Sequence, residues 1–153
     1  MKRAPAGIVP PMTERTRWTA LLAGEGNLAV NDTLGFTIED SPHPEEEVVF
    51  SWTVPAELCN AEGNLQGGVV AAFADAVLGG SGAAHLPDTH YPTLVEMKIS
   101  IVRPARAGMK LIGKGRCLKA GRRVLFCEAE VLSEDGKLIA KASGTEIPLP
   151  LRA

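Results

Sequence analysis

Several features that would point to a particular class of function are missing from this sequence. Its 153 residues contain no apolar run near the roughly 18 residues that cross a membrane. The basic start, MKRAPAGIVPPMTERT, lacks the apolar segment of a signal peptide. The formal net charge of −2 leaves no basic excess for nucleic acid. We therefore expect a cytoplasmic protein that binds neither membranes nor nucleic acid.

Cysteine and histidine are scarce as well. The three cysteines, Cys59, Cys117 and Cys127, are an odd number without the spacing of a metal site. No histidine stands at a metal-ligand spacing from another histidine, aspartate or cysteine. We expect reduced thiols, which suit the cytosol, and no metal.

What the chain does contain fits one globular domain. Its 45% hydrophobic and 22% charged residues are ordinary for that class, and its length suits a single domain. We predict an N-terminal extension, residues 1–29, with a proline-rich irregular start and one short helix in TERTRWTALLAGEG. Trp18 in this helix is interpreted as a core residue, or else as a cover for a pocket. The main domain is predicted at residues 30–153.

The hydrophobic pattern of the main domain predicts an α+β fold. Residues 33–54 indicate two strands around an acidic turn, because Leu34, Phe36 and Ile38 alternate with polar residues. A long helix is predicted within residues 65–86. Three or four further strands are predicted, within residues 93–104, 110–120, 123–134 and 138–149. One antiparallel sheet with one long helix packed on it is the simplest arrangement.

The predicted long helix has no polar face. Between Gly67 and Gly80 the only charged residue is Asp75, in a run of small and apolar side chains. A helix that is apolar all round is usually buried all round, and one sheet can cover only one side of it. We therefore expect a second copy of the chain to cover the other side.

Asp75 has two interpretations. A buried carboxylate without partners is costly, so it is either paired structurally, with backbone groups or with Ser81, or held in a cleft to act as a base or nucleophile.

Gly67 and Gly68 stand where the long helix should begin. Their N–H groups have no partner within the helix, favour negative charge and could stabilise a carbonyl oxygen that becomes negative. Alternatively, the two glycines only pack against a strand. Eight residues place Gly67 about 12 Å from Asp75 along the helix, too far for both to serve one carbonyl. If they cooperate, Asp75 comes from the neighbouring subunit.

The pattern Asn60, Gly63, Leu65, Gly67, Gly68 and then Asp75 resembles the hotdog-fold acyl-CoA thioesterases, particularly their phenylacetyl-CoA thioesterase-like (PaaI-like) group. The stretches TLVEMKISIVRPARAG and GKLIAKASGT are similar to the strand after the long helix and to the last strand of that group. The resemblance covers about residues 30–148.

The resemblance implies a sheet wrapped around the long helix, with active sites at the interface of a homodimer and tetramers built as dimers of dimers. It implies that Asp75 is the catalytic carboxylate and that the Gly67 N–H polarises the thioester carbonyl. Asn60 would orient water or substrate from the subunit opposite Asp75. Gln66 stands where many members have histidine, and it cannot titrate near neutrality.

A further set of residues is predicted to bind the acyl-CoA substrate. Leu94 occupies the position of a hydroxyl residue often found in the group, and its neighbour Thr93 is the substitute, although neighbouring strand residues face opposite sides. Gly68 would contact the substrate at the helix start. Candidate cations for the phosphates of coenzyme A are Lys98, Arg103, Lys119, Arg122 and Arg123.

The predicted function is hydrolysis of an acyl- or aryl-acyl-CoA thioester to the free acid and coenzyme A. Coenzyme A is part of the substrate, and no cofactor is expected. One alternative is a hotdog hydratase or dehydratase acting on acyl thioesters, chemistry that usually couples a histidine with a carboxylate. The other is a non-catalytic acyl-CoA-binding protein with the same fold.

Overall fold

The computed structural model of the chain describes residues 15–25 and 29–152. The predicted irregular start lies outside these residues. The elements in chain order are α1 (Arg17–Leu22), α2 (Ala29–Leu34), β1 (Thr37–Ile38), β2 (Val48–Thr53), the 3₁₀ turn η1 (Ala56–Leu58), α3 (Gly67–Ala83), β3 (His90–Ile101), β4 (Lys110–Ala120), β5 (Leu125–Ser133) and β6 (Leu138–Pro150). No helix within the described part of the chain is long and apolar enough to cross a membrane.

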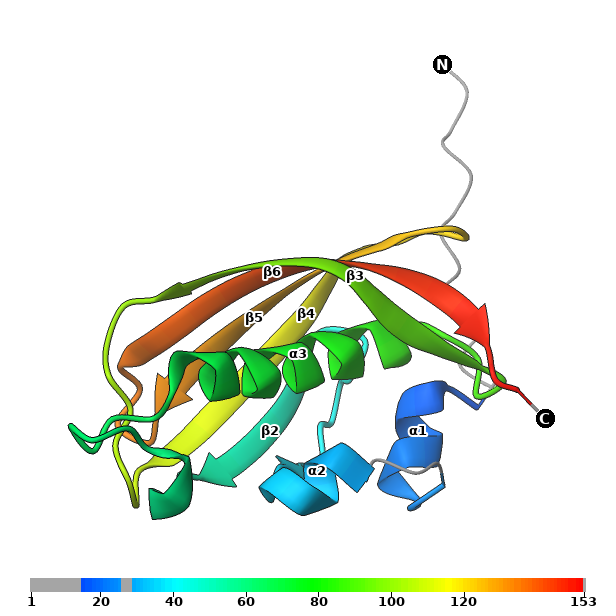
Figure 1. The fold of residues 1–153 in the computed structure, drawn as a ribbon. Helices are drawn as coiled ribbons and strands as arrows, with labels where there is room; N and C mark the ends of the chain where they lie inside the picture. Colours follow the sequence, from blue (N-terminus) through cyan, green and yellow to red (C-terminus); the bar gives the residue numbers. More distant parts are fainter. Residues whose placement is uncertain (1–14, 26–28, 153) are drawn as a thin grey trace.

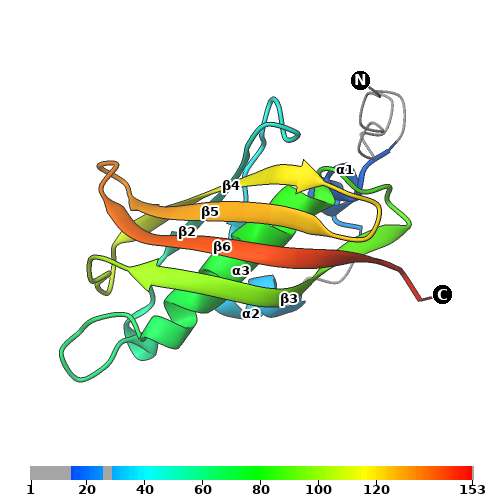
Figure 2. The ribbon, with the colours of Figure 1, turned by 90° about the horizontal axis from the view of Figure 1, so that it is seen from above.

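The strands form one antiparallel sheet in the order β1-β2-β4-β5-β6-β3, and it curls around α3 (Figures 1 and 2). This confirms the predicted hotdog fold. The inner face of the sheet approaches α3 so closely that some positions on β4 have no room for a side chain. A Cβ atom at Gly115 would lie 2.6 Å from the carbonyl oxygen of Val77 on α3.

The core lies between the sheet and the facing side of α3. Phe73 is fully buried there, and its ring lies 5.0 Å from that of Phe36 and 5.5 Å from that of Trp52. Trp18 of α1 is also fully buried, with its ring 5.7 Å from that of Phe50. The interpretation of Trp18 as a core residue is therefore confirmed.

The segment before β2 differs from the prediction. Leu34 ends the helix α2 instead of lying in a strand, and the strand β1 that follows is only Thr37–Ile38. Gly35 adopts a positive φ of 80°, and the N–H groups of Gly35 and Phe36 both donate to the carbonyl oxygen of Asn31. This is the usual way for glycine to end a helix. The alternation of apolar residues here arises from a helix end and a turn.

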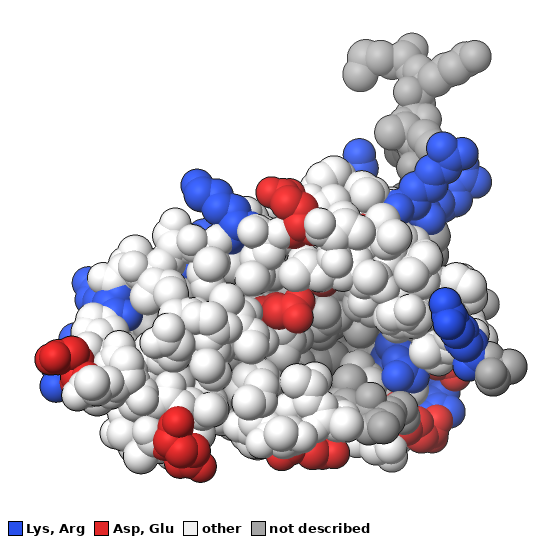
Figure 3. Space-filling view, viewed as in Figure 1, with Lys and Arg blue, Asp and Glu red and all other residues white. Residues whose placement is uncertain are grey.

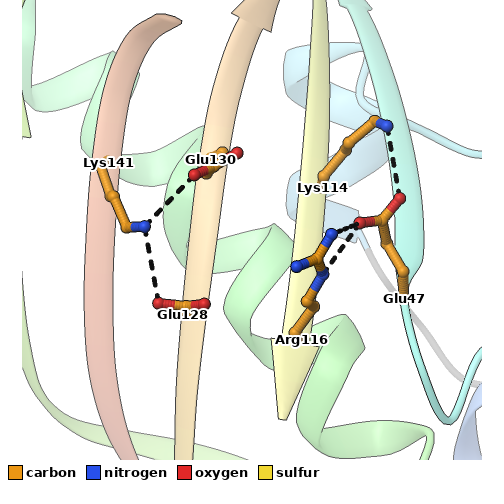
Figure 4. Close-up of polar contacts among 6 residues, drawn as sticks. All are labelled: Glu47, Lys114, Arg116, Glu128, Glu130 and Lys141. Carbon is orange, nitrogen blue, oxygen red and sulfur yellow. Dashed lines mark hydrogen bonds and ion pairs between the residues drawn. The ribbon is translucent and has the colours of Figure 1, made fainter. Parts of the chain in front are cut away.

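The outer face of the sheet carries matched charges (Figure 4). Glu47 lies 3.4 Å from Lys114 Nζ and 2.7 Å from the guanidinium of Arg116. Lys141 on β6 lies 3.7 Å from Glu128 and 3.2 Å from Glu130. These contacts join β4 to the segment before β2, and β5 to β6.

Candidate functional site

The two sides of α3 have different surroundings within one chain. The side that faces the sheet is buried, whereas a stripe on the other side stays accessible, with Asp75 exposed between the half-buried residues Ala72, Ala76 and Gly79. Within one chain the sheet leaves the other side of the helix open, and its burial by a second copy of the chain stays a prediction. The single sheet covers one side only, as the sequence indicates.

Asp75 has no hydrogen bond or ion pair with any described side chain. Ser81, the structural partner considered for it, donates its hydroxyl to the carbonyl oxygen of Leu78 at 2.7 Å. Partial burial raises the pKa of Asp75 above its ordinary value. A carboxylate in this state can take a proton from water near neutral pH better than an ordinary aspartate can.

A cavity of about 580 Å³ opens at Asp75. It lies between α3, the two N-terminal helices and the first half of β3, where the space-filling view shows a hollow with basic surface beside α1 (Figure 3). Most of its walls are apolar. They include Leu21, Val30, Phe36, Ile38, Phe50, Ala72, Ala76, Gly79, Gly80, Ala83, Pro92, Leu94 and Leu151.

The start of α3 has open hydrogen-bond donors. Gln66 precedes the helix in an extended conformation and makes no side-chain cap. Among the described residues, neither the Gly67 nor the Gly68 N–H donates to a carbonyl oxygen outside the helix. A Cβ at Gly68 would meet nothing within 4 Å. These donors can approach a ligand atom closely.

Gly67 and the cavity lie near opposite ends of β3. A Cβ at Gly67 would lie 3.4 Å from Ile101 Cδ1, at the end of the strand, whereas Thr93 and Leu94 near its start line the cavity. The eight residues from Thr93 to Ile101 extend over about 26 Å. One chain therefore does not bring its own Gly67 N–H and its own Asp75 carboxylate together.

Asn60 and Gln66 lie beside the helix start. The Asn60 side-chain oxygen accepts from the N–H groups of Glu62 at 3.0 Å and Asn64 at 3.2 Å, so it holds its own loop. Only its amide nitrogen stays available for substrate or water. Gln66 is exposed.

Thr93 and Leu94 both line the cavity. Leu94 also packs under α3, because a Cβ at Gly144 would lie 2.9 Å from both Leu94 Cδ1 and Leu78 Cδ1. The Thr93 hydroxyl is buried and has no hydrogen-bond partner among the described residues. The ladder with β6 shifts between Leu94 and Glu96, and such a bulge re-aims side chains that would otherwise alternate.

The five candidate cations do not form one cluster. Arg103 follows β3 and donates to the Leu138 carbonyl oxygen at 2.7 Å, near the start of β6. Lys119, Arg122 and Arg123 belong to the β4–β5 hairpin at the other end of the sheet (Figure 2). Lys98 is exposed on β3.

Some polar residues of the site region were not predicted from the sequence. Arg17, Asn31 and Tyr91 line the cavity, and Glu146 on β6 is fully buried beneath α3. Burial, with nearby Cys127, raises the pKa of Glu146 to about 9. In the sequence Glu146 looks like any polar residue of a strand, and the helix that carries Asn31 was not predicted.

Comparison with known proteins agrees with this architecture. The family model described as the thioesterase superfamily matches residues 62–140, more than half of the chain. A protein of Saccharolobus solfataricus, provisionally named an esterase, is 34% identical over 89 residues; the match covers 58% of this chain and 62% of that relative's length.

Two solved structures extend the comparison. One, from Ralstonia eutropha JMP134, is provisionally named a thioesterase and a phenylacetic acid degradation-related protein. It is 31% identical, covers 86% of this chain and 98% of its own, and has a TM-score of 0.77. The other, from Streptococcus mutans UA159 with acetyl-CoA bound, is 20% identical, covers 77% of this chain and 91% of its own, and has a TM-score of 0.67. The predicted family is thereby confirmed: the chain belongs to the thioesterase superfamily.

Proposed function

We propose that the protein hydrolyses acyl-CoA thioesters and that Asp75 is the carboxylate that activates water. The observation that carries this proposal is a carboxylate at the mouth of a largely apolar cavity, with a raised pKa and no partner among the described side chains, in a chain of the thioesterase superfamily. Binding of acetyl-CoA by the Streptococcus mutans protein supports coenzyme A as the thiol portion. No cofactor is required by this chemistry.

A homodimer formed through β3 would complete the site. β3 stands at the edge of the sheet, where its outer N–H and C=O groups have no strand to pair with among the described residues. Val95, Ile101 and Val102 on or just after it are 55%, 45% and 54% exposed. An open edge with apolar side chains is a template for pairing with another chain, and a symmetric dimer is the commonest solution.

Antiparallel pairing of two β3 edges joins the two halves of the site. It places the end of one β3, with Gly67 beside it, next to the start of the partner strand and hence next to the partner cavity. Each dimer then has two equivalent sites, each with Gly67 from one chain and Asp75 from the other. A tetramer of two such dimers is part of the proposal. We also propose that the protein acts in the cytoplasm.

The reaction follows from this arrangement. Asp75 takes a proton from a water molecule whose oxygen attacks the thioester carbon. The carbonyl oxygen becomes negative and is stabilised by the Gly67 N–H at the positive end of α3. The C–S bond then breaks, the thiolate of coenzyme A leaves, and the proton held by Asp75 neutralises it. In this proposal Lys98 and Arg103, near the Gly67 end of β3, bind the phosphates of coenzyme A.

The test measures free-thiol release from a panel of acyl-CoA thioesters. Asp75→Asn removes the base, and we expect kcat/KM to fall by about 10²–10⁴-fold. Gly67→Pro removes one N–H at a helix position that tolerates proline, and the extended Gln66 before it, with φ −60° and ψ 132°, suits a proline that follows. Gly67→Ala keeps the N–H and is the matched control, for which we expect a smaller loss.

Mixing the two inactive variants tests the shared site. After unfolding and refolding together, a heterodimer of Asp75→Asn and Gly67→Pro has one site with both groups intact, so thiol release should reappear. Undiminished activity of Asp75→Asn would remove this residue from the mechanism. Substrate binding without thiol release would favour the acyl-CoA-binding alternative, and a change in enoyl absorbance alone would favour a hydratase.

A further inference from the structure

The cavity has polar groups that the hydrolysis of a thioester does not use. Arg17, Asn31 and Tyr91 lie among its apolar walls, in addition to Thr93. A cavity that only had to hold a hydrocarbon chain would need none of them, since a buried polar group without a partner is unfavourable.

Arg17 is the cation of this group. Its backbone N–H donates to the Leu86 carbonyl oxygen at 2.9 Å, which ties α1 to the segment just after α3. Arg17 lines the cavity, and its side chain has no hydrogen bond or ion pair with another described residue. Arg15, two residues earlier, differs because it pairs with Glu25 and lies 3.9 Å from Asp88. The side chain of Arg17 is therefore available to a ligand.

Two neutral side chains that line the cavity also have no hydrogen-bond partner among the described residues. Asn31 is only 7% exposed, and its side-chain amide makes no hydrogen bond with any described group. The Thr93 hydroxyl is buried and likewise has no partner in the part of the chain that the structure describes. The Asn31 side-chain amide can donate hydrogen bonds to an acceptor in the cavity, whereas the Thr93 oxygen is itself fully buried and closed to a ligand.

Arg17 lies at a distance from Asp75, where the thioester carbon would react. The Arg17 backbone is anchored at Leu86, just beyond the end of α3, and this end lies eight residues after Asp75, about 12 Å along the helix axis. Ala72, Ala76 and Ala83 form part of the floor between the two ends. An acyl chain of medium length, with its thioester at Asp75, would bring its far end towards the guanidinium.

We propose that the preferred substrates are acyl-CoA thioesters whose acyl group ends in a second carboxylate, and that Arg17 binds this carboxylate with a hydrogen bond from Asn31. This inference rests on the proposed function, because it concerns the acyl end of the same site. The planar guanidinium matches a carboxylate with two parallel hydrogen bonds. A site with buried polar groups discriminates against a ligand that leaves them unpaired.

The experiment compares two thioesters of equal chain length, suberyl-CoA and octanoyl-CoA, by thiol release from the full-length protein. We expect the wild type to favour suberyl-CoA in kcat/KM by about ten- to hundredfold, the size of a charged hydrogen bond. Arg17→Met keeps the length of the side chain without its charge, and it should lower the suberyl-to-octanoyl ratio at least tenfold. Arg15→Met, outside the cavity, is the control and should leave the ratio unchanged.

Two results would overturn the inference: a wild type that hydrolyses octanoyl-CoA as well as or better than suberyl-CoA, or an unchanged ratio in Arg17→Met. If Arg17→Met does not fold, the wild-type ratio and that of Asn31→Leu decide the question, and a reduced ratio in Asn31→Leu supports it. Failure of the wild type to release thiol from any thioester would instead contradict the proposed function. Failure of this inference and failure of the proposed function therefore give different experimental results.

Discussion

The two sides of α3 are built for different purposes. Towards the sheet the helix carries Phe73, Val77 and Leu78, all fully buried. Away from the sheet it carries Ala72, Ala76 and other small residues that leave space for the cavity. Large side chains stabilise the fold on one side, and their absence on the other makes room for a ligand.

Each side of α3 has one carboxyl group, and the two groups have different surroundings. Glu146 lies under the sheet-facing side, fully buried, with one oxygen 3.5 Å from Cys127 Sγ and the other without a partner among the described residues. A Cβ at Gly82 would overlap it, so the glycine makes its space. Its raised pKa keeps it protonated at neutral pH. Asp75, on the accessible side, has only partial burial to raise its pKa.

Of the differences between the two sides of α3, we expect Glu146 to have the largest effect on the free energy of unfolding, through its dependence on pH. The folded protein keeps this proton up to pH about 9, whereas the unfolded chain loses it near the ordinary value for glutamate. Stability from this group is therefore complete at low pH and declines as the pH rises, by up to about 1.4 kcal/mol per unit.

Glu146→Gln should flatten that decline, because the amide stays neutral in both states. Urea unfolding at several values between pH 5 and pH 8 measures the two slopes. Glu130→Gln, on the outer face of the sheet, is the matched control and should retain the wild-type slope. Equal slopes for wild type and Glu146→Gln would show that Glu146 is not held protonated.

Adjacent glycines of α3 provide the next test. A Cβ at Gly80 would lie 2.6 Å from Phe50 Cε2, whereas one at Gly79 would meet nothing within 4 Å. Gly80→Ala should lower the free energy of unfolding by about 1–3 kcal/mol through overpacking. Gly79→Ala should raise it by about 0.5–1 kcal/mol, since alanine favours the helix. Denaturant unfolding at one pH measures the stability of both variants. Effects of the same sign would contradict the assignment of Gly80 to the packed side of α3 and Gly79 to the accessible side.

The smallest effect is expected on the outer face of the sheet. Glu47→Gln removes the partner of Lys114 and Arg116 at the surface, and we expect a loss of about 0.2–1 kcal/mol. The difference from the wild type should shrink in about 1 M salt, where exposed charges are screened. A loss well above this range, or one that salt does not reduce, would mean that Glu47 contributes to the core.

Much of the architecture follows from patterns that are local in the chain. The long helix, the strands after it and the family are all evident in the sequence, because periodicity of apolar residues and short motifs need no distant contacts. The open donors at Gly67 follow from the same reasoning, since any helix start has them. The distance between Gly67 and Asp75 could also be estimated from the sequence, because it depends only on the rise per residue of a helix. Their pairing across a dimer stays a prediction.

Tertiary structure alone decided which residues surround the cavity and which carboxyl group is hidden. Arg17 and Asn31 belong to the N-terminal segment, and they meet α3 and β3 only because α1 and α2 fold back over the accessible side of the helix. Glu146 alternates with its neighbours like any strand residue, and its burial depends on Gly82, 64 positions earlier. Sequence periodicity reports which side of an element is apolar, but it cannot report which distant side chain will lie opposite.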